Sequence, residues 1–415
     1  MKMILLIFLP LFLFAQSYSL TQLIEHASKN NKQVKAKILQ SKSALSQVDA
    51  QERDFWPTLD IGGAYSNVSP TTLISPAHTG TGYAKAGFNI YDGGRRSALL
   101  RSKNYLYSAS RLEKEAFEKS MTLKIINNYY TILKLKSVLI AMKAQTKEIH
   151  AQIERMEKFK NAGLSTQVDI DKLRAEYDNN IFTIETTKFN IVSNLENLSL
   201  LSGIRANSLK ENRILEPKRV TFEEYEKSKI LKANANSLKE NASAIDAGYM
   251  PQLRVEDQYS VSKYSDTAAL PGVPSDGFLP ENQNKLMLTV NMRLFDNAKM
   301  KKDKEAVMYQ KLAIDSESMY AIEEQKMQFK LAKSRMKTVR ARGKSARSAL
   351  KAATSTYKVV LEKYEVGLVD NITYLDALNS KTLSDARYKE ALYDYEISKS
   401  IFYFYAGKNI REYIR

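Results

Sequence analysis

The chain has 415 residues, nine prolines, no cysteine and a formal net charge of +17. The lack of cysteine excludes disulfide bonds and a lipid-modified N-terminal cysteine. The basic residues are interspersed with Glu and Asp and form no dense block with aromatic side chains, so we interpret them as solvated helix faces and expect no nucleic-acid partner.

Residues 1–17 have the pattern of a secretory signal peptide. Lys2 supplies a positive charge, residues 3–14 form an apolar run, and Ala15-Gln16-Ser17 provides a small-residue exit. A transmembrane helix needs about 20 apolar residues, so this shorter run predicts export rather than a membrane anchor. No later stretch approaches 18 consecutive apolar residues.

The remainder of the chain contains a tandem internal duplication, which three pairs of segments indicate in the same order. The pairs are residues 54–61 with 248–255, 90–94 with 294–298, and 159–164 with 363–368. The first pair lies 194 positions apart and the other two lie 204 apart, because the loop after the first segment is longer in the second copy. The segments expected in chain order are a first repeat at 18–204, a linker at 205–222, a second repeat at 223–405 and a C-terminal tail at 406–415.

Each repeat has two stretches in which apolar and polar residues alternate, as they do in a β-strand with one apolar face. The predicted strands cover about residues 58–68, 82–91, 252–262 and 285–295. Strands of about ten residues with this alternation are typical of transmembrane barrels; a half-buried soluble sheet is the alternative. Four strands are too few to close a barrel, which needs about eight, so subunits must share it, and three copies would supply twelve strands.

The rest of each repeat predicts very long helices, because no proline occurs between Ala77 and Glu216 or after Glu281. A continuous helix over residues 95–160 would extend on the order of 100 Å at ~1.5 Å per residue. Its apolar residues repeat at three- and four-residue spacing, which favours coiled-coil packing against neighbouring helices. Gly163 and Gly367 lie where we expect the helices to reverse direction, since glycine readily adopts a left-handed backbone.

No pattern in the sequence predicts catalysis. The three histidines, His26, His78 and His150, lack metal-ligand or catalytic-triad spacing. The Gly93-Gly94 pair is not followed by the Lys-Ser/Thr of a phosphate-binding loop. We therefore expect no enzymatic activity, no cofactor and no metal site, and we interpret the methionines of the long helices as packing residues.

These features together resemble the TolC family of outer-membrane efflux proteins over essentially the whole exported chain. The resemblance is carried by the repeated motifs Trp56-Pro57-x-Leu59 and Met250-Pro251-x-Leu253, Tyr91-Asp92-Gly93-Gly94 and Phe295-Asp296, and Gly163-Leu164 and Gly367-Leu368. It implies an α+β membrane protein of Gram-negative bacteria, a trimer with a shared 12-stranded β-barrel in the outer membrane. A long periplasmic coiled-coil barrel of α-helices would continue the duct, with an equatorial belt drawn from the 205–222 linker and the 406–415 tail.

The resemblance also implies partners and candidate sites. Members of the family form the outer-membrane channel of tripartite efflux or type I secretion systems. A periplasmic adaptor docks at the helix reversals, here Gly163, Leu164, Gly367 and Leu368, and links the channel to an inner-membrane efflux pump or ABC transporter. Some members close the periplasmic mouth with aspartates six and nine positions after the second-copy glycine. Asp376 matches the second of these positions, Thr373 departs from the first, and Asp169 matches the first in the other repeat.

A second function remains open from the sequence, that of an exported coiled-coil structural or adhesive protein. The paired amphipathic hairpins argue against it, because a fibrous stalk has no use for membrane strands. Within the channel interpretation, drug, metal and protein export share this outer component, so the sequence does not identify the cargo.

Overall fold

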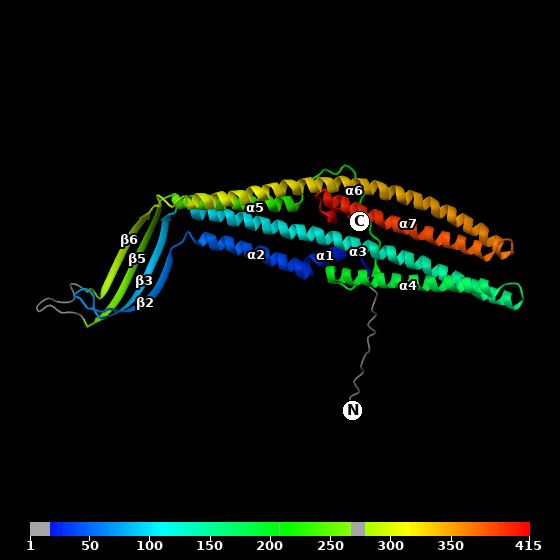
Figure 1. Cartoon of the computed structure of the whole chain (residues 1–415), viewed down its shortest axis with the longest axis horizontal. Helices are drawn as coiled ribbons and strands as arrows, with labels where there is room; N and C mark the ends of the chain where they lie inside the picture. The colour runs from blue at the N-terminus through cyan, green and yellow to red at the C-terminus, as the bar shows by residue number, and fades with distance from the viewer. Residues whose placement is uncertain (1–16, 207, 267–278) are drawn as a thin grey trace, which may run out of the picture. The chain divides into compact units, whose positions relative to one another are not determined.

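The computed structural model describes residues 17–206, 208–266 and 279–415 (Figure 1). The predicted signal peptide lies outside the described residues except for Ser17. The chain divides into two compact units. We call residues 39–112 and 228–319 the strand unit, and residues 17–38, 113–227 and 320–415 the hairpin unit.

The strand unit contains one antiparallel sheet with the order β2-β3-β5-β6, whose strands lie side by side in Figure 1. The strands are β2 (Thr58–Asn67), β3 (His78–Tyr91), β5 (Gln252–Ser265) and β6 (Asn282–Asn291). The central β3–β5 pair joins the first repeat to the second. β2 and β6 are the two edges, and neither has a second partner strand among the described residues.

The last strand differs from the predicted range of 285–295, because β6 begins three residues earlier and ends at Asn291. The register explains this end. Asn291 lies opposite Gln252, the first residue of β5, and the preceding Pro251 has no N–H to donate. Leu294 therefore continues the apolar alternation of the sequence without lying in a hydrogen-bonded strand.

The register brings apolar positions of all four strands onto one face of the sheet. Leu59 lies opposite Ala86, and Val255 lies between Phe88 and Leu288. Several of these side chains are largely exposed, with Leu59 at 77% and Leu288 at 62% of full exposure. The sheet therefore presents a mostly apolar surface that the described residues of the chain leave uncovered.

The opposite face of the sheet is polar. Glu256 lies 3.9 Å from the Nζ of Lys85 and 3.4 Å from Arg254 Nη2. Thr81 and Ser262 share a hydrogen bond of 2.9 Å between their hydroxyls. One carboxylate departs from this division, since Asp257 lies between Ala86 and Leu286 on the apolar face.

Helices adjoin the sheet at the end where β2 and β5 begin. They are α2 (Lys32–Arg53), α3 (Arg95–Asn161), α5 (Glu226–Asp246) and α6 (Lys299–Glu365), each of which contributes residues to both units. A short 3-10 turn, η1 (Ala247–Tyr249), joins α5 to β5. Within the strand unit α3 packs on α5, where Ser102 and Ser237 share a buried hydrogen bond of 2.8 Å.

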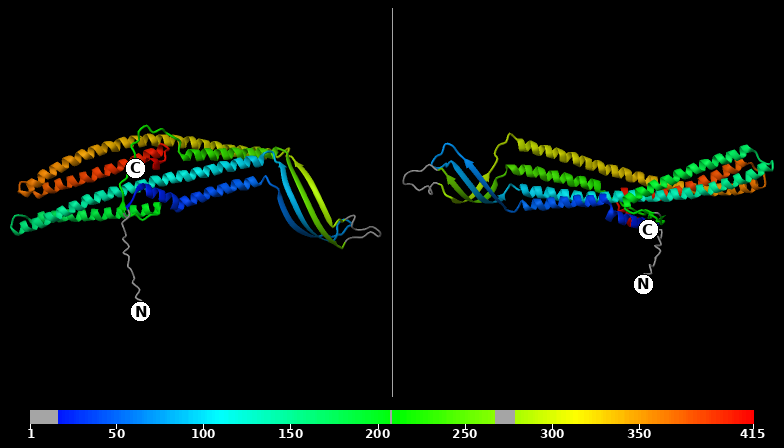
Figure 2. Two further views of the ribbon diagram at one scale, coloured as in Figure 1. Left: turned by 180° about the vertical axis from the view of Figure 1, so that it is seen from behind. Right: turned by 90° about the horizontal axis from the view of Figure 1, so that it is seen from below.

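Two helical hairpins build the hairpin unit, and both views of Figure 2 show them. α3 returns through α4 (Gln167–Ser202), and α6 returns through α7 (Asn371–Tyr405). α3 and α6 have the same length, 67 residues, and begin 204 positions apart. This correspondence confirms the tandem duplication, because equal helix lengths extend the sequence offset over the whole hairpin.

The predicted linker and C-terminal tail lie together in the hairpin unit. β1 (Ser17–Tyr18) pairs in parallel with β4 (Ser208–Leu209), ahead of α1 (Leu20–Asn30). Ile214 and Ile414 form an antiparallel bridge, and the tail ends in the 3-10 turn η3 (Ile410–Tyr413). The ring of Tyr413 stacks on Tyr403 at 3.9 Å between centroids, which fixes the tail to α7.

Among the described residues, no helix carries an apolar stretch long enough to cross a membrane.

Candidate functional site

The first helix reversal lies between α3 and α4 and is closed by glycine. Gly163 has a left-handed φ of 74°, a backbone that side chains with a Cβ adopt at a cost. The N–H of Leu164 donates to the carbonyl of Phe159 at 2.8 Å, and the N–H of Gly163 donates to Lys160 at 2.9 Å. These two bonds satisfy carbonyls at the helix end in the manner of a Schellman motif.

The second reversal, between α6 and α7, repeats this geometry. Gly367 has φ 78°, the Leu368 N–H donates to Lys363 at 2.9 Å, and the Gly367 N–H donates to Tyr364 at 3.1 Å. The two reversals expose equivalent side chains, Leu164 at 76% and Leu368 at 73%. An exposed leucine on a rigid turn can bury apolar surface against a partner.

A buried cluster lies beneath both reversals and joins the two hairpins. It contains residues of all four helices: Ile149 and Met156, Ile170 and Leu173, Tyr357 and Tyr364, and Tyr374, Ala377 and Leu378. The rings of Tyr364 and Tyr374 stack at 4.6 Å between centroids. Because one core supports both reversals, their positions relative to one another are set by packing within the hairpin unit.

One carboxylate organises the tyrosines of this cluster. Oε1 of Glu148 accepts hydrogen bonds from Tyr357 at 2.7 Å and from Tyr374 at 2.9 Å. Burial raises the pKa of both phenols, and the nearby Glu148 charge raises them further. Arg155 adds a contact across the hairpins, since its guanidinium lies over the rings of Phe159 and Tyr364 and donates to the Glu365 carbonyl at 3.2 Å.

α4 begins with a capping box and α7 with a single N-cap bond, and the two polar residues involved are exchanged between the repeats. In α4, Thr166 is the N-cap and its hydroxyl donates to Asp169 at 2.6 Å, while the Asp169 N–H donates back at 3.3 Å. In α7, Asp370 is the N-cap and accepts from the Thr373 N–H at 2.8 Å. Hydrogen bonds from Thr373 lower the pKa of the Asp370 carboxyl.

The two predicted gate residues therefore differ in their surroundings. Asp169 is the third residue of α4, and its carboxylate is engaged in the capping box. Asp376 lies in the second turn of α7, is exposed, and forms no ion pair or hydrogen bond within residues 17–206, 208–266 and 279–415. The structure does not bring the two carboxylates of one chain together.

Sequence reasoning missed three parts of this site: the Glu148 tyrosine pair, Arg155 and the Asp370 cap. Glu148 and Arg155 act through contacts between α3 and the α6–α7 hairpin, for which the sequence holds no local signal. The Asp370 cap had a signal, because Asp followed three residues later by Thr reverses the Thr-x-x-Asp pattern of the first repeat.

Several solved structures of membrane proteins share this fold. The crystal structure of a membrane protein from Pseudomonas aeruginosa matches with a TM-score of 0.80 at 15% identity, covering 94% of this chain and 93% of that one. The outer membrane protein VceC of Vibrio cholerae matches with a TM-score of 0.79 at 15% identity, over 94% and 96% of the two chains. The CmeC outer membrane channel of Campylobacter jejuni gives 0.81 at 13% identity, over 94% and 85%. No curated protein matches this chain in sequence.

The sheet, with two edges unpaired among the described residues, and the paired helical hairpins thus show the fold of solved outer-membrane channels. Residues 23–203 match the family model of the outer membrane efflux proteins. The chain is similar to that family over these residues, which make up less than half of its length.

Proposed function

We propose that three copies of this chain form a passive duct that carries solutes from the periplasm through the outer membrane, as the outer component of a tripartite efflux or type I secretion system. The observation that carries this proposal is the sheet of the strand unit, with an exposed apolar face and two free edges. The family match supports the direction of transport.

The apolar face supports contact with lipid, and the free edges support assembly. In a bilayer, each backbone N–H or C=O group without a hydrogen-bond partner costs several kcal/mol, because lipid tails cannot replace the missing bond. β2 and β6 run antiparallel to one another, as the register of the intervening strands requires. β6 of one copy can therefore pair with β2 of the next, and three copies close a ring of twelve strands around the polar face.

The two reversals are the proposed docking sites for a periplasmic adaptor. Gly163 and Gly367 set the turns, and Leu164 and Leu368 offer exposed apolar side chains on them. Their shared core keeps the turns rigid, so a partner would bind without first ordering a loop. The adaptor would connect the duct to an inner-membrane efflux pump or ABC transporter.

The periplasmic mouth is the proposed position of Asp376 and Asp169. Threefold symmetry would place three copies of each carboxylate around one axis, and such rings favour cations. The exposed and unengaged Asp376 supports a gate role directly. Asp169 already accepts hydrogen bonds in its capping box, so its contribution to a gate would add to a structural one.

Assembly is the test of the architecture. The exported protein, extracted in a mild detergent, should sediment with the mass of three chains. Leu368→Asp is the matched control, because it alters a reversal outside the sheet and should leave the trimer intact. A stable, folded monomer recovered from outer membranes would contradict the proposed duct.

A further inference from the structure

Two hollows of the strand unit join at the end of the sheet next to the helices. One has a volume of about 1020 Å³ and lies among the start of β5, the end of β6 and the starts of α3 and α6. The other has about 640 Å³ and lies between β3, β5 and the end of α2. Arg95, Leu99, Gln252 and Asn291 line both, so the two form one continuous depression.

Arginine is the dominant charged residue of this depression. Five arginines line it: Arg53, Arg95, Arg96, Arg254 and Arg293. Arg96 is held by Asp92 at 3.0 Å, and Arg254 is paired with Glu256. The side chains of the other three form no ion pair or hydrogen bond with any residue that the structure describes.

The carboxylates that line the depression are already engaged. Asp92 pairs with Arg96, and Asp303 pairs with Lys299 at 2.7 Å. Asp54 accepts a hydrogen bond of 2.5 Å from the Gln51 side chain. Arg53, Arg95 and Arg293 therefore form no ion pair with a lining carboxylate. The charge of Arg293 acts on the carboxylate of Asp296, which accepts hydrogen bonds from the Tyr249 hydroxyl at 3.0 Å and the Met300 N–H at 3.0 Å.

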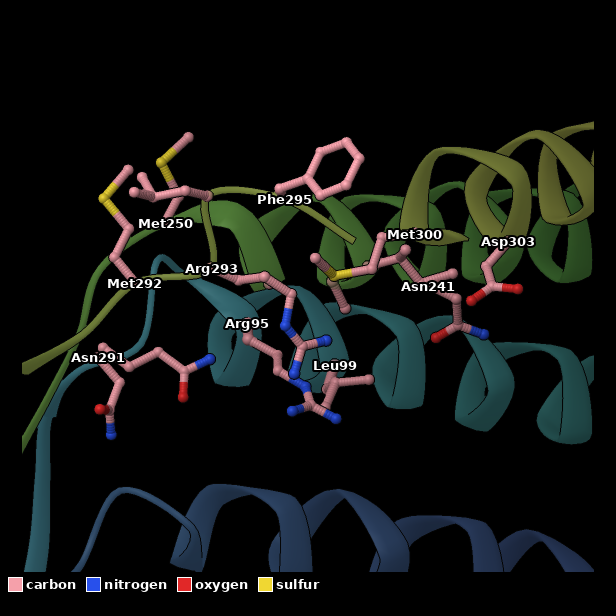
Figure 3. Close-up of a pocket in the computed structure, with 15 residues that line it drawn as sticks. Arg95, Leu99, Asn241, Met250, Asn291, Met292, Arg293, Phe295, Met300 and Asp303 are labelled. Carbon is pink, nitrogen blue, oxygen red and sulfur yellow. The ribbon is translucent and has the colours of Figure 1, made fainter. Parts of the chain in front are cut away.

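The orientation of these groups places them on the polar side of the sheet. Figure 3 shows the side chains of Arg95 and Arg293 directed into the same part of the depression, whereas Met250, Met292 and Phe295 point the other way. Gln252 and Asn291 lie opposite one another in the register and add amide donors beside the arginines. Guanidinium and amide donors converging on one hollow suit a carboxylate, phosphate or sulfonate group.

We infer that Arg95 and Arg293 bind anionic groups of solutes that pass through the duct. This inference rests on the proposed function, because three copies place six of these guanidiniums around the polar interior of the closed sheet. A ring of arginines raises the local concentration of anions and favours their passage. Lipid is the less suited occupant, since the arginines lie on the side away from the apolar face.

The test measures ion selectivity of the full trimer in a planar bilayer under a salt gradient. Arg293→Gln should shift the permeability ratio toward cations by about twofold or more at low ionic strength, and Arg95→Gln with Arg293→Gln should shift it further. Lys263→Gln is the matched control, because it removes the same charge from the apolar-face side of β5, opposite Gly80. Tripolyphosphate, used as an anionic probe, should block the wild-type pore at lower concentration than it blocks the double variant.

Each other outcome overturns the inference in a distinguishable way. If the wild-type trimer conducts but both arginine variants keep its selectivity and its block by tripolyphosphate, the ring does not bind anions. If the variants keep the selectivity of the wild type but copurify with less phospholipid, measured as phosphorus, the arginines bind lipid instead. If the wild-type trimer forms no pore, the proposed duct fails, and the anion ring falls with it.

Discussion

Alanine substitutions at three glycines of the hairpin unit should change the stability of the fold in an order set by the backbone conformation and the space around each glycine. Gly343 lies inside α6 with nothing within 4 Å of an added Cβ, so Gly343→Ala should stabilise the fold by about 0.5–1 kcal/mol per chain. Gly367 also has open space, but its φ is 78°. Gly367→Ala should therefore destabilise the fold by about 1–2 kcal/mol through the left-handed backbone alone. In Gly407→Ala the added Cβ would lie 2.3 Å from the Glu223 carbonyl oxygen, and the loss should be larger still.

Thermal unfolding of the purified trimer measures this order, with Gly163→Ala as an internal replicate of Gly367→Ala. The two reversal variants should lose similar stability, because both glycines have φ near 75° and open surroundings. The reasoning is refuted if Gly343→Ala and Gly367→Ala change the midpoint in the same direction. It is also refuted if Gly407→Ala is the mildest of the three.

Three further predictions concern function and pH. Gly367→Pro together with Gly163→Pro should abolish efflux while trimers still assemble, and so should bulky residues at Leu368 and Leu164 together. Drug-susceptibility or secretion assays measure this loss. Export that survives these changes would place adaptor docking elsewhere. Asp376→Ala with Asp169→Ala should raise single-channel conductance in a planar bilayer and reduce cation preference, whereas a purely capping role would lower thermal stability and leave conductance unchanged. Burial raises the pKa of Tyr403 from 10.0 to about 12, so its contribution to stability is complete below pH 10 and is lost as pH rises from 10 to 12; Tyr403→Phe should flatten that part of the pH–stability profile.

Much of the fold follows from periodicity that any segment carries in its own residues. Alternation predicted the four strands, and the proline-free tracts predicted the long helices. The end of β6 could not be predicted this way, because Leu294 continues the alternation while hydrogen bonding stops opposite Gln252. A strand ends where its partner ends, and that partner lies about forty positions away in the chain.

The candidate site likewise contains residues that the sequence could predict and residues that it could not. The glycines of the reversals could be predicted because a left-handed turn needs a particular residue at one position. The pairing of Glu148 with Tyr357 and Tyr374 depends on helices brought together from separate repeats. Nothing local distinguishes Glu148 from the other acidic residues of α3, so its role became visible only in the assembled core.

The exchanged caps of α4 and α7 have a consequence for how duplicated genes diverge. Threonine and aspartate occupy the two capping positions in opposite order, yet each helix start keeps one hydroxyl and one carboxylate. Changing one arrangement into the other takes two substitutions, and the first of them alone would leave a turn with two carboxylates or with none. Thr373→Asp, for example, would place a second negative charge beside Asp370 and would set like charges against each other. The two positions therefore form one chemical pair, and residue-by-residue comparison of the two halves would count two changes where the chemistry records one exchange.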